Sequence, residues 1–194
     1  MTQWVDPAGR GRERGPIGLF RAWIGVMTAP REFFRQAVAP GDQAPGLVFL
    51  SVVVAIEESL RYVLVPSGAP VFGGRPVASA VLAVLVTVVL IAPTGLHLLA
   101  AIQTILLWPI TEDRAGISET VQVLAYATAP CVVSGVSLAP LQLLAAGYGS
   151  VLLIVGLSTV HEVSYWKTTL AGATPAALLY GVAFGGFDAL GALV

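Results

Sequence analysis

Five ionisable side chains stand inside long apolar runs: Glu57, Glu58, Arg61, His97 and Asp188. A charged side chain at the centre of a bilayer costs about 2.5–3.5 kcal/mol on insertion scales, so such residues rarely lack a role. On a helix, Glu57 and Glu58 precede Arg61 by four and three residues, close enough for both carboxylates to pair with the guanidinium. Asp188 lies close to the chain end and is expected at the membrane interface.

Two kinds of role suit these residues. Glu57, Glu58, Arg61 and His97 form a candidate intramembrane polar cluster, which would conduct or couple a proton or an ion. The alternative is a neutralised structural cluster near the outer interface, where long side chains extend toward water. The two differ in whether the side chains converge on a water-accessible cavity or pack against one another.

Motifs for catalysis and metal binding are absent from the sequence. His161-Glu-Val-Ser-Tyr165 departs from the H-E-x-x-H pattern of zinc proteases, because tyrosine stands where the second histidine belongs. The chain contains no G-x-S-x-G elbow and no Walker A loop. Cys131 is the single cysteine, which excludes a disulfide or a cysteine metal site within one chain. We therefore expect a protein that is not an enzyme and that uses no cofactor and no metal.

The composition is that of an integral membrane protein. Hydrophobic residues make up 56% of the 194 residues and charged residues only 11%, and the mean hydropathy is +0.84. A soluble domain carries about 25% charged residues, so this chain lacks the charge needed to cover a surface exposed to water. The net charge of −1 argues against a nucleic-acid partner, because there is no basic domain.

Apolar runs of bilayer length predict an all-α membrane protein, a bundle of five transmembrane helices. A span needs about 20 apolar residues. The predicted spans are about 44–65, 77–107, 125–146, 150–165 and 176–194. In the second, Pro93 and Gly95 predict one kinked, tilted helix, with two short re-entrant pieces as the alternative.

The chain from residue 116 to 149 predicts a change of environment and then a turn. Gly116 to Pro130 is expected to begin as a surface helix and to become the third span where it turns fully apolar. Gly147-Tyr-Gly149 is short and flexible, so it predicts a tight hairpin between the third and fourth spans.

The segment before the first span divides in two. Residues 1–15 are polar and lack apolar periodicity, so we expect a disordered cytosolic tail before a membrane domain over 16–194. Residues 17–38 combine apolar positions at helical spacing with arginines, which predicts amphipathic helices lying in the headgroup region. Packing against the protein's own membrane helices is the alternative. The candidate membrane-surface anchors are Phe20, Arg21, Trp23, Phe33, Phe34, Trp166 and Lys167.

The basic residues predict the orientation. Six arginines precede the first span, Arg114 and Lys167 fall in later loops on the same side, and only Arg75 falls on the opposite side. By the positive-inside rule, the N-terminus is cytoplasmic and, after five spans, the C-terminus is external. We expect a multi-pass protein of the cell membrane that contacts the lipid bilayer and associates with copies of itself or with other membrane proteins.

Three short motifs occur in a recognisable order. Ala29-Pro-Arg-Glu-Phe-Phe34 comes just before the first span, and Gly116 and Thr120 lead to Leu124-Ala-Tyr-Ala-Thr-Ala-Pro130. Val155-Gly-Leu157 is followed by His161. With these motifs the chain, from Pro16 to Val194, resembles the Yip1 domain family of five-span membrane proteins, in its prokaryotic branch.

The resemblance implies a function without catalysis. Eukaryotic members act in vesicle trafficking and bind Rab GTPases, but the Asp-Leu-Tyr-Gly-Pro type of motif linked to those members is missing here. Rab binding is therefore not carried over. What remains is a non-enzymatic membrane protein that works through helix packing or partner recruitment. The alternative is a small transporter or channel that uses Glu57, Arg61 and His97.

Overall fold

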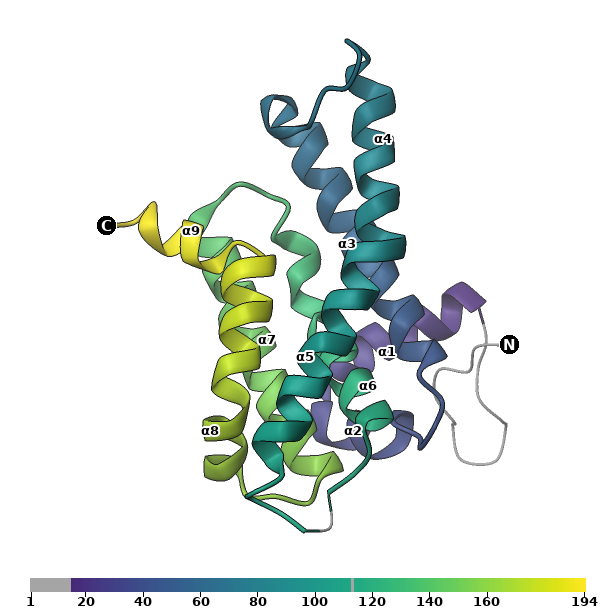
Figure 1. The fold of residues 1–194 in the computed structure, drawn as a ribbon, viewed down its shortest axis with the longest axis vertical. Coiled ribbons are helices and arrows are strands. Elements are labelled where there is room, and N and C mark those ends of the chain that lie inside the picture. Colours follow the sequence, from purple (N-terminus) through teal and green to yellow (C-terminus); the bar gives the residue numbers. More distant parts are fainter. Residues whose placement is uncertain (1–14, 113) are drawn as a thin grey trace.

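The computed structural model describes residues 15–112 and 114–194, and all regular elements in this part of the chain are helical (Figure 1). The predicted tail of residues 1–15 lies outside the described residues except for Gly15. The N-terminal half contains α1 (Gly15–Thr28), α2 (Pro30–Ala37), α3 (Ala44–Leu64), the 3₁₀ turn η1 (Pro66–Gly68), α4 (Pro76–Val86), the π-helical segment η2 (Thr87–Ile91) and α5 (Ala92–Leu107). The C-terminal half contains α6 (Ile117–Ala127), the 3₁₀ segment η3 (Ala129–Val133), α7 (Ala139–Val160), α8 (Tyr165–Ala176), the π-helical segment η4 (Ala177–Ala183) and α9 (Gly186–Gly191).

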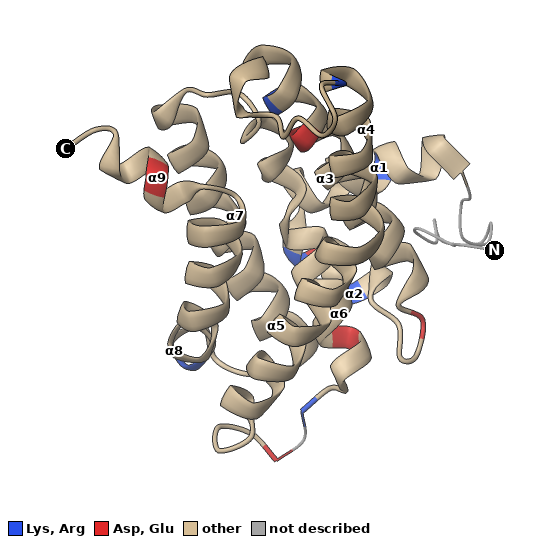
Figure 2. Ribbon diagram, turned by 45° about the horizontal axis from the view of Figure 1, so that its top comes forward, with Lys and Arg blue, Asp and Glu red and all other residues tan. Residues whose placement is uncertain are grey.

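The long helices run along one axis of the molecule and turn back at alternate ends (Figure 1). The loop 65–75 marks what we call the upper end, and residues 108–112 and 114–116 mark the lower end. Two segments, Pro76–Leu107 and Ala139–Val160, are long and apolar enough to cross a membrane. α3 has 21 residues but carries Glu57, Glu58 and Arg61. Figure 2 shows how few charged residues the helices carry.

The central helix is α6, which corresponds to the stretch predicted to begin at the surface. Its start does lie at the surface, since Gly116 and Ile117 are exposed, but every residue from Thr120 to Ala127 is buried inside the protein. The ring of Tyr126 packs edge-on against Phe33 and Phe49, with centroids 4.9 and 5.2 Å away. Thus α2 and α3 both pack against α6, and beyond its first turn the helix has no face left for solvent.

A reciprocal pair of hydrogen bonds fixes the chain between α2 and α3 to the central helix. The Ala39 N–H donates to Gln122 Oε1 at 3.1 Å, and Gln122 Nε2 donates to the Ala39 carbonyl at 2.7 Å. The buried amide of Gln122 is therefore satisfied by backbone. Nearby, a Cβ on Gly46 would lie 3.2 Å from Gln122 Cα, so glycine lets α3 approach α6 closely.

Residues 76–107 form one continuous helix with a π-helical segment inside it, rather than two re-entrant pieces. Proline cannot donate an N–H, and its ring crowds the carbonyl four residues earlier. For Pro93 that carbonyl belongs to Val89, which lies within η2. The wider π-helical turn accommodates the proline without ending the helix.

The boundary between the third and fourth predicted spans is wrong. The chain turns at residues 134–138, and α7 then continues without a break through Gly147 and Gly149. Pro140 occupies the first turn of α7, where a missing N–H costs nothing. Gly149 serves packing, since a Cβ there would lie 2.5 Å from Cε1 of Tyr180.

The fifth predicted span also has different limits. The helical segment begins at Tyr165 and runs through Pro175 into η4, instead of starting afresh at residue 176. It ends at Ala183, two residues before Gly185, whose φ of +72° is a left-handed conformation that favours glycine. The short helix α9 then folds back, so that the Phe187 ring lies where a Cβ on Gly181 would be.

Candidate functional site

Glu57, Glu58 and Arg61 come together on one face of α3, as their spacing predicts. Arg61 Nη2 donates a hydrogen bond to Glu57 Oε1, and Arg61 Nη1 lies 3.6 Å from Glu58 Oε1. Only 2% of Glu57 and 8% of Glu58 is exposed, whereas 38% of the Arg61 side chain is exposed. Two buried carboxylates therefore share one guanidinium that reaches toward the surface.

The backbone of Glu57 is held against the turn that follows η3. A Cβ on Gly135 would overlap the Glu57 carbonyl oxygen, so this turn sits directly on α3. Buried Ser134 belongs to the same turn, and buried Cys131 belongs to η3 just before it. The Glu57 end of the polar cluster therefore lies inside protein.

His97 is not part of this cluster. Its Nδ1 lies 2.7 Å from the carbonyl oxygen of Pro93, and its Nε2 lies 2.9 Å from Oε1 of Gln43. Gln43 precedes the first turn of α3, so His97 lies near the lower end, whereas Glu57 lies 14 residues further along. Asp188 is exposed on α9, away from the others.

A cavity of about 290 Å³ opens beside the two carboxylates. Its walls come from α3, from η2 and α5, and from η4 with the residue after it, and they are apolar except for Glu57, Glu58 and Thr87. The lining residues are Leu50, Val54, Glu57, Glu58, Thr87, Ile91, Ala92, Gly95, Leu96, Leu99, Leu179, Ala183 and Phe184.

A second set of buried polar residues lies at the lower end. Nε2 of His161 is 3.2 Å from the Thr120 hydroxyl, which is itself 3.1 Å from the Gly116 carbonyl oxygen. Burial lowers the pKa of His161 to about 4, and the positive charge of Arg114 acts in the same direction. Gln103 is fully buried on α5, and its amide has no hydrogen-bond partner within the part of the chain that the structure describes.

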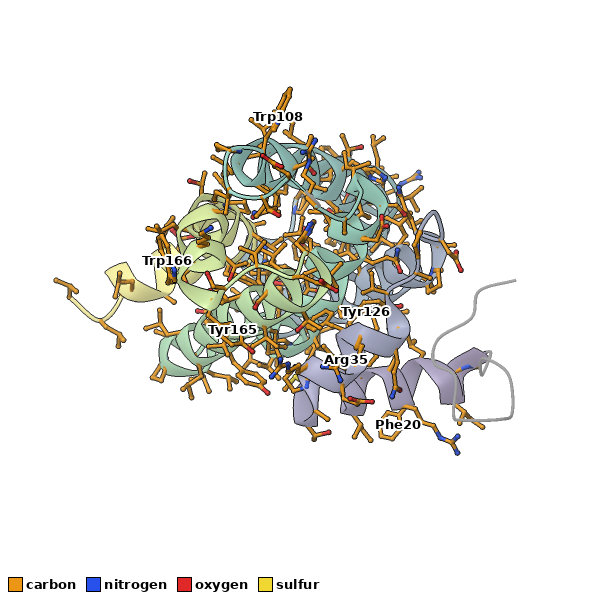
Figure 3. The ribbon with its side chains drawn as sticks, turned by 90° about the horizontal axis from the view of Figure 1, so that it is seen from below. Phe20, Arg35, Trp108, Tyr126, Tyr165 and Trp166 are labelled. Carbon is orange, nitrogen blue, oxygen red and sulfur yellow. The ribbon has the colours of Figure 1, made fainter. Side chains whose placement is uncertain are left out.

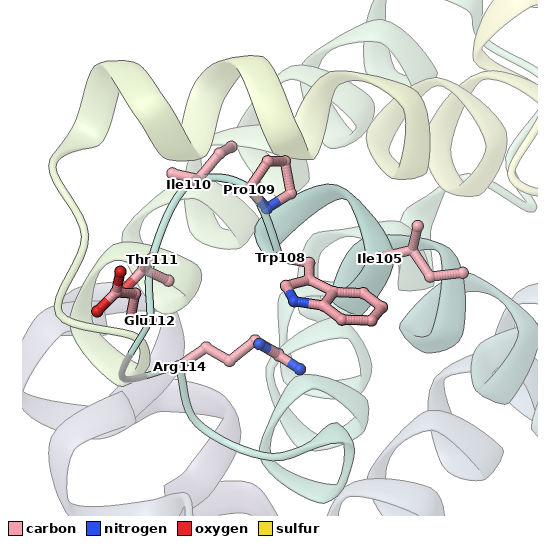
Figure 4. A pocket seen from close by; sticks show the side chains of 7 residues that line it. All are labelled: Ile105, Trp108, Pro109, Ile110, Thr111, Glu112 and Arg114. Atoms are coloured by element: carbon pink, nitrogen blue, oxygen red, sulfur yellow. The ribbon is translucent and has the colours of Figure 1, made fainter.

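The loop after α5 forms a shallow hollow of about 880 Å³ at the lower end (Figure 4). The Arg114 guanidinium lies over the Trp108 ring, 5.5 Å from its centroid, a cation–π contact. Glu112 and Thr111 line the same hollow. The exposed indole and the nearby charge suit the boundary between lipid and water.

The predicted surface anchors divide into exposed and buried residues. Phe20 and Trp166 are each 64% exposed and point outward (Figure 3), and Arg21 is exposed beside Phe20. Trp23 packs against Phe49, with ring centroids 5.7 Å apart, and Lys167 is partly buried. Phe33 and Phe34 are 5% and 1% exposed and belong to the core, so for them the anchor prediction is wrong. Their apolar face turns toward α6 and α7, which leaves it unavailable to lipid.

Residues 15–112 and 114–194 bring together no group of three His, Cys, Asp or Glu side chains able to hold a metal ion. Sequence reasoning did not identify the cavity, Gly135 or Gln103. Gln103 is one polar residue in an apolar run, a signal available beforehand. The cavity depends on distant segments, so no local pattern marks it.

A family model described as the Yip1 domain matches residues 24–186. The chain belongs to the Yip1 family. The match runs from the middle of α1 to the start of α9, and it agrees with the apolar helices in making this a Yip1-type membrane protein. No curated protein and no solved structure matches the chain.

The three motifs of the Yip1 domain meet in the core. A Cβ on Gly156 would lie 2.7 Å from Val123 Cγ1 and 2.9 Å from Phe34 Cζ. Glycine at this point thus allows α2, α6 and α7 to touch, and His161 adds its contact with Thr120. The residues that carry the family resemblance hold these helices together.

Proposed function

We propose that this Yip1-family protein is non-enzymatic and acts by recruiting a partner through helix contacts in the cell membrane. The observation that carries the proposal is the free face of α4. Only 6% of the residues in an 18-residue apolar stretch of Pro76–Leu107 are buried, against 33% for α7. Leu85 of α4 and Val89 of the following segment η2 are 54% and 71% exposed.

The topology proposed with this function follows the basic residues. In addition to the two apolar segments, three helical segments cross the bilayer in this topology: α3, α6 with η3, and α8 with η4. The lower end of the molecule is cytoplasmic. Arg114 belongs to the lower end and Arg75 to the upper loop, in keeping with the positive-inside rule. Reporter fusions in loop 65–75 and after Val194 should both report the outside, and one in loop 108–116 the inside. An inside signal at Val194 would require an even number of spans.

Packing within the polar cluster supports recruitment over transport. Two of the four side chains, Glu57 and Glu58, line one cavity, but Arg61 and His97 do not. Arg61 binds Glu57 and His97 binds Gln43, so the four do not converge on one route. Ion flux in proteoliposomes should match that of empty liposomes. A saturable flux that Glu57→Gln abolishes would establish the transporter instead.

Photocrosslinking in native membranes tests partner recruitment directly. A photoreactive residue at Leu85 should give discrete protein adducts. The control is the same residue at Leu144, which is 70% exposed on α7 and is expected to meet lipid. Lipid adducts alone at both positions would overturn the proposal.

A further inference from the structure

The cavity beside α3 has an unusual electrostatic character. Glu57 and Glu58 are both buried in its wall, and Arg61 is the cation that faces them. One guanidinium balances one carboxylate, so ionisation of both glutamates leaves one negative charge uncompensated. A buried charge is costly unless a partner neutralises it and hydrogen bonds satisfy it.

Glu58 provides the open acceptor. Its Oε1 lies 3.6 Å from Arg61 Nη1, too far for a hydrogen bond, and the Tyr62 phenol is the neighbouring side chain that can donate to this carboxylate. Its Oε2 is buried and has no hydrogen-bond partner among residues 15–112 and 114–194. Buried carboxylate oxygens are normally paired, so this atom indicates a missing donor.

Both π-helical segments of the described chain border the same cavity. Thr87 and Ile91 belong to η2, and Leu179 and Ala183 belong to η4. Such segments interrupt regular packing and occur often at functional sites. Here they widen the helices on two sides of one apolar space.

The space itself has room at Gly95. A Cβ there would meet no atom within 4 Å, although the residue lies in the cavity wall. A volume of about 290 Å³ is at the lower limit for small-molecule sites, which suits a single chain of methylene groups.

We propose that this cavity binds a membrane amphiphile with a primary ammonium group, whose alkyl chain fills the apolar part and whose ammonium donates a hydrogen bond to Glu58 Oε2. The ammonium supplies the positive charge that two carboxylates and one guanidinium lack. An anionic headgroup would be repelled, and a quaternary ammonium has no N–H to donate. Glu58 lies six residues before the end of α3, about 9 Å below it, so an amphiphile in that leaflet can reach it. The proposal is independent of partner recruitment through α4.

Ligand-dependent thermal unfolding of the full chain in neutral detergent micelles tests the charge requirement. Dodecylamine, protonated at pH 7, should raise the unfolding midpoint in a saturable way, and 1-dodecanol should do so much less. Glu58→Gln should weaken the dodecylamine response about tenfold or more, since a charge-assisted hydrogen bond is lost. Equal responses to the amine and the alcohol, or an unchanged response in Glu58→Gln, would mean simple apolar partition and would overturn the proposal.

A second variant tests the location without touching the carboxylates. Gly95→Leu fills the cavity and should abolish the response to dodecylamine while the variant remains folded. Gly147→Leu is the matched control, because a Cβ at this glycine of α7 also meets no atom within 4 Å and lies outside the cavity wall. Its response should equal that of the unaltered protein. Undiminished binding in Gly95→Leu would place the amphiphile elsewhere and refute the assignment, even if Glu58→Gln does not fold.

Discussion

Two glycines in the middle of α7 should respond in opposite directions to the same substitution. Gly147 and Gly149 both lie inside the helix, where alanine is favoured over glycine by about 0.8–1.0 kcal/mol. A Cβ at Gly147 meets no atom within 4 Å, so Gly147→Ala should gain most of that amount. A Cβ at Gly149 would lie 2.5, 2.9 and 3.0 Å from three atoms of the Tyr180 ring.

Tyr180 cannot easily move to make room for the methyl group. Its side chain is 2% exposed, and its hydroxyl donates a hydrogen bond of 3.1 Å to the Ala127 carbonyl. Overpacking costs about 1–3 kcal/mol, and a strained or lost hydrogen bond adds about 1 kcal/mol. After the helix gain is subtracted, Gly149→Ala should lose about 1–3 kcal/mol. The two variants should therefore differ by about 2–4 kcal/mol.

Thermal unfolding of the purified protein in detergent, followed by circular dichroism, measures the difference. For a chain of this size 1 kcal/mol corresponds to about 2–4 °C. Gly147→Ala should raise the midpoint by about 2–4 °C, and Gly149→Ala should lower it by about 2–12 °C. Adding Tyr180→Leu to Gly149→Ala should cost less than the two changes do separately, because the second change removes the ring that the methyl group meets. Loss of stability in both single variants would refute the continuous helix, since a hairpin at 147–149 needs glycine at both positions.

The other predictions concern charged and titrating residues. Arg61→Leu leaves two buried carboxylates without their cation and should cost about 1–3 kcal/mol, less than a fully buried pair because the Arg61 side chain is 38% exposed. The control is Arg35→Leu, which breaks the pair of Arg35 with Glu32, whose side chains are 59% and 56% exposed. It should cost at most about 1 kcal/mol. Equal unfolding midpoints for Arg61→Leu and Arg35→Leu would contradict the burial argument. Lowering the pH from about 6.5 to about 4 should destabilise the fold by up to about 3 kcal/mol through His161, because the unfolded chain takes up a proton that the folded imidazole, with its pKa lowered to about 4, does not. His161→Asn should flatten this part of the stability–pH curve, and an unchanged slope would show that other groups produce it.

Local patterns predicted those elements whose limits depend on local signals. The limits of α3 agree with the predicted run to within one residue, because Pro45 lies in its first turn and Pro66 follows its end. The pairing of Glu57 with Arg61 followed from helical spacing alone. In contrast, Gly147 and Gly149 have the composition of a turn, and only their contacts across the bundle identify them as packing positions.

The same limit applies to the candidate site. His97 lies in α5 and Glu57 in α3, and the sequence does not show which residues of the two helices meet. The contact of His97 with Gln43 depends on the register between α3 and α5. The cavity also depends on two π-helical segments that begin 90 residues apart in the sequence, at positions 87 and 177. Neither register nor π-helical geometry has a signature in one sequence.

The central helix α6 is poorly suited to enter a bilayer by itself during synthesis. With η3 it provides only the 17 residues Ile117–Val133, and buried Thr120, Gln122 and Thr128 lie among them. Gln122 finds its partner in the backbone of Ala39, which is made earlier, and Gly156 of α7, which is made later, closes over Val123. We expect the two strongly apolar segments that flank α6 in the sequence, Pro76–Leu107 and Ala139–Val160, to insert first. α6 then enters the membrane by packing between them. Nascent chains cut after Val133 should leave α6 outside the membrane, whereas chains cut after Val160 should have it in place.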